Sequence, residues 1–238
     1  MSIFAIGDLH LPGGDKKPMD VFGSHWEHHF ERICADWRSR VKPEDIVLIP
    51  GDISWAMQLG DALSDLRDIA KLPGTILLLR GNHDFWWSSL SQLRACLPEN
   101  MHAVQNDAFD AGTCVFCGTR GWTIPLGQNA TAQDEKLYRR EAMRLEMSLK
   151  DAGAHGGRTA DLCNDALSAA AAGDAASGDG VHASAERIRR KAVRLRPSAR
   201  AERAARLQRE LPRVRYDLVS CDALGFALKD VSLESAEG

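Results

Sequence analysis

The chain has 238 residues, of which 44% are hydrophobic and 26% charged, and its formal net charge is −3 at pH 7. These values are typical of a globular protein and exclude the strong positive charge of many nucleic-acid-binding proteins. No apolar run approaches the length of a membrane span, and the first residues, MSIFAIGDLH, lack the features of a signal peptide. Six cysteines at irregular spacing favour reduced thiols over a disulfide framework, so we expect a cytoplasmic protein.

Predicted strands and helices alternate in the first half of the chain. The runs Ile3–Ile6, Asp45–Pro50 and Thr75–Arg80 are apolar and rich in β-branched residues, as buried strands are. Between the first two runs, one helical face is predicted by Trp26, Phe30, Ile33, Trp37 and Val41. Between the second and third runs, a second face is predicted by Leu59, Leu63, Leu66 and Ile69. This alternation predicts crossover connections and a mostly parallel sheet in an α/β fold.

The amino-acid composition of the chain changes after residue 151. Thr113–Trp122 predicts a further strand and turn, and a charged helix is predicted from Ala132 to Lys150. Residues 152–213 contain no Trp, Tyr or Phe and include a stretch of nearly low complexity, so no secondary structure is predicted there. A terminal strand region is predicted over residues 214–231. We therefore expect a single domain over residues 1–238 with an atypical Ala/Arg-rich segment inside it.

Each of the three early strands is followed by glycine and then by polar residues. In open α/β sheets, ligand sites lie beyond the carboxyl ends of the strands. The residues delivered there are Asp8, His10, Asp52, Asn82, His83 and Asp84. Carboxylate, imidazole and amide ligands suit Mn, Fe or Zn, and an Asp between two ions can bridge them for phosphoryl displacement. A single Gly-Asp pair is more often a turn with a solvated carboxylate, but three in register favour a metal site.

The motifs GDLH, GD and GNHD after successive strands resemble those of the calcineurin-like metallophosphoesterases, and GDISWAM and RGNHDFWW resemble a bacterial branch of that family. The resemblance covers residues 1 to about 150, with YDLVSCDALGF as the terminal strand. It implies a four-layer α/β/β/α sandwich of two sheets flanked by helices, with two divalent ions at the sheet edge. It also implies metal-dependent hydrolysis of a phosphoester substrate, with no membrane partner, by a metal-bound hydroxide.

The resemblance also implies individual roles. Asp8 and His10 would bind the first ion, Asp52 would bridge both ions, and Asn82 would bind the second ion. His83 would act near the phosphate as an acid or charge stabiliser, oriented by Asp84. Asn82 and His83 would therefore also contact the substrate, and Trp122 is a further candidate for substrate contact.

Two motifs that the resemblance requires are missing, namely H-Y-P-P and G-H-x-H. After His102 the chain has only His155 and His182, in neither context. However, Asp165–Ala170 can be encoded GAT GCA CTA TCC GCC GCT, which gives MHYPPL when read from the second base. Arg194–Arg200 can likewise be encoded to give VYGHLHG. We therefore expect residues from about 155 to about 212 to be an out-of-frame reading, with a disrupted second half of the fold and impaired activity.

Other interpretations of the sequence remain open. The chain could be a non-catalytic binding module that contacts nucleic acid through the Arg-rich stretch 187–213, although that stretch has no aromatic residues for base stacking. It could also be a pseudo-enzyme that binds phosphorylated ligands without hydrolysing them. Cys114 and Cys117 have the spacing of a zinc or redox pair, but buried core thiols are the more probable interpretation.

Overall fold

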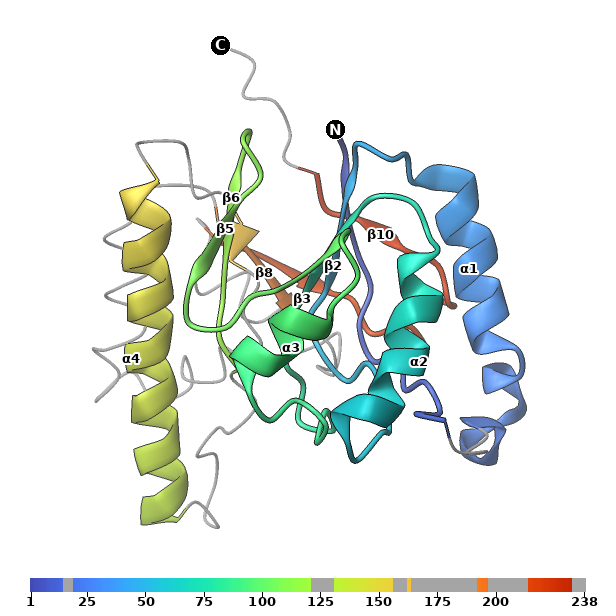
Figure 1. Ribbon diagram of the computed structural model, residues 1–238, viewed down its shortest axis with the longest axis horizontal. Helices are drawn as coiled ribbons and strands as arrows, with labels where there is room; N and C mark the ends of the chain where they lie inside the picture. Colours follow the sequence, from blue (N-terminus) through green and yellow to red (C-terminus); the bar gives the residue numbers. More distant parts are fainter. Residues whose placement is uncertain (15–18, 121–130, 156–161, 164–191, 197–213, 233–238) are drawn as a thin grey trace. The chain divides into compact units, whose positions relative to one another are not determined.

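The computed structural model describes most of the chain, namely residues 1–14, 19–120, 131–155, 162–163, 192–196 and 214–232. The chain divides into two compact units: Met1–Ala103 with Val219–Gly238, and Val104–Leu218. Each unit contains one five-stranded sheet, and helices flank the strands (Figure 1). Within the described ranges, none of the helices combines the length and the apolar character that crossing a membrane requires.

The sheet of the first unit is mostly parallel, as predicted. Its strand order is β10-β1-β2-β3-β4. The strands are β1 (Ile3–Ala5), β2 (Ile46–Ile49), β3 (Thr75–Leu78), β4 (Met101–Ala103) and β10 (Lys229–Asp230). Strands β1 to β4 run parallel to one another, and only β10 runs antiparallel, beside β1. The carboxyl ends of β1, β2 and β3 therefore meet at one edge of the sheet.

Helices of the first unit cover one face of this sheet. They are η1 (Met19–Phe22), η2 (Ser24–Trp26), α1 (His29–Arg40), α2 (Leu59–Ala70) and α3 (Leu90–Cys96), with η1 and η2 being short 3-10 helices. Trp37 of α1 and Leu66 of α2 are fully buried in the same core as Val47 and Ile49 of β2. The two helical faces predicted from the sequence are therefore the faces that pack on the sheet.

The start of the first helix differs from the prediction. The predicted apolar face begins at Trp26, whereas α1 begins at His29 and Trp26 lies in η2. His28 has a left-handed backbone conformation with φ 53°, which interrupts a right-handed helix at that point. Trp26 nevertheless packs in the same core, because η2 presents it on the same side as α1.

The second unit has the strand order β5-β6-β7-β8-β9. Its elements are β5 (Ala108–Asp110), β6 (Val115–Cys117), α4 (Ala132–Ala154), β7 (Leu162–Cys163), β8 (Ala192–Arg196) and β9 (Val214–Leu218). Helix α4 begins with a capping box in which Thr131 and Asp134 satisfy each other's backbone N–H groups. Leu145 and Leu149 of α4 pack against Val115 and Cys117 of β6, so Cys117 is a core side chain, and Cys114 is also buried.

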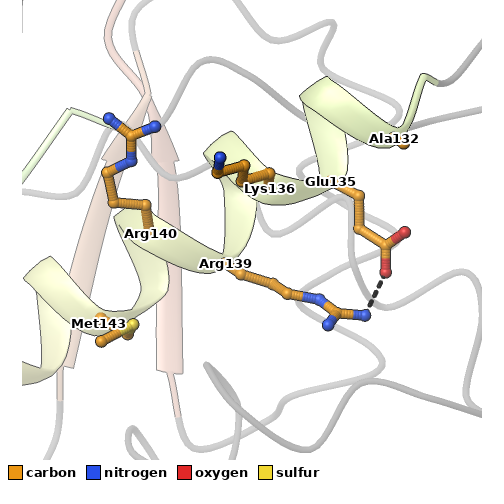
Figure 2. Close-up of a pocket in the computed structure, with 6 residues that line it drawn as sticks. All are labelled: Ala132, Glu135, Lys136, Arg139, Arg140 and Met143. Carbon is orange, nitrogen blue, oxygen red and sulfur yellow. Dashed lines mark hydrogen bonds and ion pairs between the residues drawn. The ribbon is translucent and has the colours of Figure 1, made fainter.

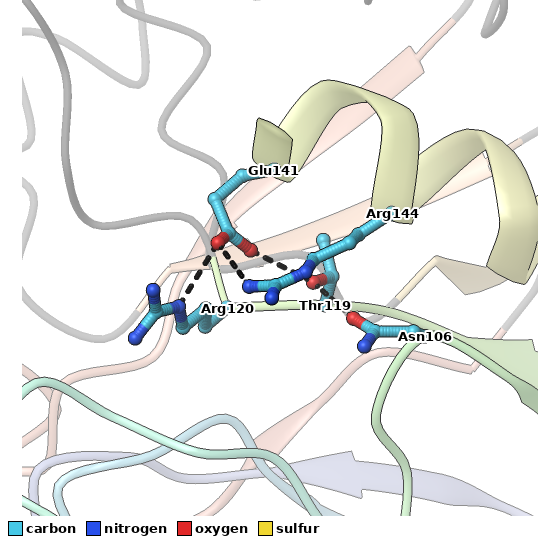
Figure 3. Close-up of polar contacts among 5 residues, drawn as sticks. All are labelled: Asn106, Thr119, Arg120, Glu141 and Arg144. Atoms are coloured by element: carbon cyan, nitrogen blue, oxygen red, sulfur yellow. Dashed lines mark hydrogen bonds and ion pairs between the residues drawn. The ribbon is translucent and has the colours of Figure 1, made fainter. Parts of the chain in front are cut away.

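A buried polar cluster ties α4 to the end of β6 (Figure 3). The carboxylate of Glu141, 2% exposed, accepts hydrogen bonds from Arg120 and Arg144 at 3.0 and 2.6 Å. The hydroxyl of Thr119 lies 3.1 Å from Glu141 and 2.7 Å from the amide oxygen of Asn106. The two guanidinium groups satisfy the charge of Glu141, which would otherwise be costly to bury.

The second sheet draws two strands, β7 and β8, from the atypical segment 152–213. They pair in parallel with each other and with β6 and β9. Most of that segment lies outside the described residues, so its expected disruption stays a prediction. Nucleic-acid binding by the Arg-rich stretch 187–213 also stays an alternative prediction, because only β8 of that stretch is described.

Candidate metal centre

Two loops at the carboxyl edge of the first sheet are joined by backbone hydrogen bonds. The amides of Asp8 and His10 donate to the carbonyl oxygens of Gly51 and Asp52, at 3.1 and 3.0 Å. The pairing between β1 and β2 thus continues beyond both strands. This pairing fixes where the side chains after each strand end can point.

Three of the predicted ligands come together there. One ligand atom from each of Asp8, His10 and Asp52 lies within 4.8 Å of the other two. Asp8 and Asp52 are buried, at 4% and 3% exposed, and His10 is half-buried. Two carboxylates and an imidazole at this spacing can coordinate one divalent cation.

The same three residues have left-handed backbone conformations. The φ angles are 56° at Asp8, 47° at His10 and 53° at Asp52. Residues with a side chain rarely adopt this region, which costs roughly 1 kcal/mol or more at each position. Such strain persists only where surrounding contacts fix it, and it concentrates at functional sites.

Two glycines allow the second and third loops to touch. A Cβ atom on Gly51 would lie 2.5 Å from the Cα atom of Gly81. A Cβ atom on Gly81 would lie 2.1 Å from the backbone nitrogen of Asp52 and 2.2 Å from its Oδ1 atom. Only glycine fits at either position, because a side chain on Gly51 would collide with the backbone of Gly81, and one on Gly81 would collide with Asp52.

The carboxylate of Asp84, which is fully buried, joins the same two loops. It accepts hydrogen bonds from the backbone amides of Asp52 and Gly81, at 2.9 and 2.7 Å. It also accepts hydrogen bonds from the amides of Ile53 and Ser54 and from the indole of Trp86. Burial, together with the nearby charge of Asp52, raises the pKa of Asp84 to about 6. Asp84 therefore positions Asp52 through the backbone.

His83 lies beside the cluster on the third loop. Its amide donates to Oδ1 of Asp52 at 2.8 Å, and its ring centroid is 5.6 Å from that of His10. Asn82 precedes it and is exposed. The roles predicted for Asn82 and His83 remain proposals. Trp122 lies outside the described residues.

Trp55 is a site residue that the sequence did not reveal. Its ring stacks on His10, with centroids 4.7 Å apart and planes at 19°, and lies 4.8 Å from the ring of His83. Its indole N–H donates to the sulfur of Met19. The only sequence signal was its position within GDISWAM, which does not specify a contact with the first loop.

The unsatisfied polar atoms of the cluster fit a cation. Neither carboxylate oxygen of Asp8 has a hydrogen-bond partner, nor does Nδ1 of His10. Burial and the charge of Asp52 raise the pKa of Asp8 to about 8, and burial lowers the pKa of His10 to about 4. A neutral imidazole is the form that binds metal, and a cation would satisfy both orphaned carboxylate oxygens.

A cavity of about 400 Å³ lies elsewhere, against the exposed side of α4 (Figure 2). Its described lining residues all belong to that helix: Ala132, Glu135, Lys136, Arg139, Arg140 and Met143. Arg139 is paired with Glu135. Among these residues there is no imidazole or second carboxylate, so the carboxylate and imidazole cluster is the better candidate for chemistry.

A comparison with known protein families identifies the family of this chain. Residues 1–151 match the family model described as calcineurin-like phosphoesterase. The protein of unknown function AQ665 from Aquifex aeolicus is similar in structure over 95% of this chain and 94% of its own, with 16% identity and a TM-score of 0.47. Phosphopantetheinyl hydrolase (PptH) from Mycobacterium tuberculosis is similar over 95% of this chain and 79% of its own, with 13% identity and a TM-score of 0.38. A comparison with curated proteins found no match.

The close contact between Gly81 and Asp52 predicts that alanine will destabilise the protein at Gly81 but not at Gly60. Gly81→Ala should lower the free energy of unfolding by about 2 kcal/mol or more, because the new Cβ atom collides with backbone. Gly60→Ala, in α2 with open space around it, should be neutral or stabilise by up to about 1 kcal/mol. Urea denaturation of both variants measures the difference, and equal stabilities would contradict the loop geometry.

The hydrogen bonds of Asp84 predict a large cost for replacing one of its acceptor oxygens with a donor. In Asp84→Asn, an NH₂ group would face backbone donors, so the free energy of unfolding should fall by about 3 kcal/mol. Asp68→Asn removes the same charge from an exposed pair with Lys71 and should change stability by less than about 0.5 kcal/mol. Thermal unfolding followed by circular dichroism compares the two variants, and a similar small loss in both would show that Asp84 does not hold the loops.

Proposed function

Since the chain belongs to the calcineurin-like phosphoesterase family, we propose that it is a metal-dependent hydrolase of phosphoric esters. The observation that carries the proposal is the convergence of Asp8, His10 and Asp52, with both oxygens of Asp8 left without a partner. These groups lie at the carboxyl edge of a parallel sheet, where α/β proteins bind their ligands. A phosphoester is therefore the proposed substrate class.

Each residue of the cluster has a proposed role. Asp8 and His10 would hold the first cation, and Asp52 would lie between it and a second cation held by Asn82. When bound, such ions lower the pKa of a coordinated water and neutralise phosphoryl charge. His83, held by its amide against Asp52, would contact the phosphoryl group. Asp84 is a positioning residue, because its hydrogen bonds reach the backbone of the loop that carries Asp52.

The number of metal ions depends on the atypical segment. Two ions, of Mn, Fe or Zn, are proposed for the intact site, but the histidine motifs that would complete it are absent from this sequence. The family match ends at residue 151, next to the start of the proposed out-of-frame segment, about 155 to about 212. This coincidence supports the frame proposal and a weakened second metal site in the chain as written.

We expect restoration of the reading frame to change the metal content. A chain corrected by one base after codon 151, with the original frame resumed before Tyr216, should bind two Mn²⁺ per chain. The chain as written should bind one at most, because Asp8, His10 and Asp52 are the only such cluster among the residues that the structure describes. Equilibrium dialysis with elemental analysis counts the ions. Resequencing the coding DNA between codons 145 and 220 tests the frame directly, and equal stoichiometry in both chains would contradict the proposal.

Hydrolysis of a generic aryl phosphate tests the catalytic roles. In the frame-corrected chain, Asp52→Asn and His83→Ala should each lower kcat/KM by at least about 100-fold, because each removes a group beside the reacting phosphate. Asp68→Asn, an exposed residue paired with Lys71, is the control and should keep the original rate. Turnover at the original rate in Asp52→Asn would refute the assignment of this cluster as the active site.

A binding role is the second candidate for the chain as written. The Arg-rich stretch 187–213 would bind nucleic acid through phosphate contacts, with an affinity that falls steeply as salt rises. A pseudo-enzyme would instead bind phosphorylated ligands without turnover. The proposed compartment is the cytoplasm, because six cysteines at irregular spacing favour reduced thiols over a disulfide framework.

A further inference from the structure

A strip of aromatic rings leads outward from the candidate metal centre. The ring of Trp55 stacks on that of His10, and the ring of His83 lies 4.8 Å from that of Trp55. The ring of Phe85 in turn meets His83 edge-on, with centroids 6.4 Å apart and planes at 80°. Successive ring contacts therefore connect a proposed metal ligand, His10, to Phe85.

Phe85 is the exposed end of this strip. It is the first of three consecutive aromatic residues in the loop after β3, and its side chain is 52% exposed. Trp86 and Trp87, which follow it, are each 1% exposed and belong to the core of the first unit. The loop therefore buries two large rings and leaves the third accessible beside His83.

The two rings that flank His83 are held in place by neighbouring backbone and side-chain groups. The amide of Phe85 donates to the carbonyl of His83 at 2.9 Å, and the amide of Trp55 donates to the carbonyl of Leu11 at 2.8 Å. The indole N–H of Trp55 donates to the sulfur of Met19. Both rings are therefore positioned before a ligand arrives, which reduces the entropy that binding costs.

The surface that the strip offers to a ligand is apolar and aromatic. The indole N–H of Trp55 is already used by Met19, and the side chain of Phe85 has no polar atom. Aromatic groups pair by stacking or edge-on contact and gain affinity beyond the apolar area that they bury. Because His83 is the residue proposed to contact the phosphoryl group, a group esterified to that phosphate would lie against this strip.

We propose that Trp55 and Phe85 form a subsite for a flat aromatic group next to the phosphate, so that aromatic phosphoesters are the substrates that the site favours. Phe85 is the specificity-determining residue, because its exposed ring packs against His83 and lies outside the three clustered ligands. The inference rests on the proposed function, and it narrows the substrate class from phosphoesters in general to those that carry an aromatic group.

Binding of three phosphonates to the full chain with Mn²⁺, measured by isothermal titration calorimetry, tests this subsite. Benzylphosphonate copies phenyl phosphate without a hydrolysable ester bond, and it should bind at least about 10-fold more tightly than methylphosphonate. It should also bind about threefold more tightly than cyclohexylmethylphosphonate, whose ring has a similar size but is not flat. Equal affinities for the two ring-bearing phosphonates would overturn the inference, because apolar area alone would then explain binding.

Variants of Phe85 assign the preference for the flat ring to this side chain. Phe85→Leu stays apolar but loses the ring, so it should lose most of the preference for benzylphosphonate over cyclohexylmethylphosphonate. Phe85→Tyr keeps a ring and should keep the preference. Phe22→Leu is the control, because it removes a ring that is 64% exposed from η1, outside the strip. A preference that survives in Phe85→Leu, or that falls equally in Phe22→Leu, would contradict the role of Phe85.

Trp55→Leu tests the other ring of the subsite. It should lower the same ratio of affinities, which is insensitive to a change at the metal centre because both phosphonates present the same phosphonate group to it. An unchanged ratio in Trp55→Leu would refute the part of the inference that concerns Trp55.

Methylphosphonate tells failure of the inference from failure of the proposed function, because it has no ring. Phe85→Leu should leave its affinity within about twofold, whereas Asp52→Asn should abolish its binding. If methylphosphonate needs Mn²⁺ to bind but benzylphosphonate binds no better, the metal centre stands and the aromatic subsite is refuted. If none of the three phosphonates binds in the presence of Mn²⁺, or if Asp52→Asn binds all three as the original chain does, the proposed metal centre is wrong and the inference fails with it.

Discussion

The buried carboxylate of Asp84 is the interaction on which the rest of the site depends. It accepts hydrogen bonds from backbone amides of both the loop after β2 and the loop after β3. The amide of Asp52 is one of these donors. The contact between Gly51 and Gly81 brings those loops close enough for one carboxylate to serve both. The first loop is then joined to the second by backbone hydrogen bonds from Asp8 and His10. A site built in this way is rigid before any ligand arrives.

Rigidity of this kind has an electrostatic cost. Asp8 and Asp52 are buried close together, both oxygens of Asp8 lack a partner, and three ligand residues have left-handed backbones. Favourable packing elsewhere in the unit must offset these terms, and the core that α1 and α2 form on the sheet supplies it. Proteins retain such unfavourable arrangements where they prepare a site for its ligand.

Much of the first unit could be predicted from the sequence, and the family confirms the α/β fold expected from its motifs. Strands β1, β2 and β3 are strongly apolar, and each leads into glycine. Strands β4 and β5 were missed because their short sequences, MHA and AFD, form no apolar run. Trp55 was missed for another reason: it meets His10 and His83, which are 45 and 28 positions away in the sequence. No local pattern encodes which loop a side chain will meet.

Strand β10 pairs with β1, and residues 219–221 pair with Gly7. This pairing has a consequence for synthesis on the ribosome. Residues 3–8 and 219–231 lie side by side although more than 200 positions separate them, so the edge of the sheet beside β1 stays open until the second of these segments has emerged. The first sheet can therefore be completed only after translation has passed residue 230. A nascent chain that returned to its reading frame too late would lose this final piece, however faithfully its first 151 residues had been read.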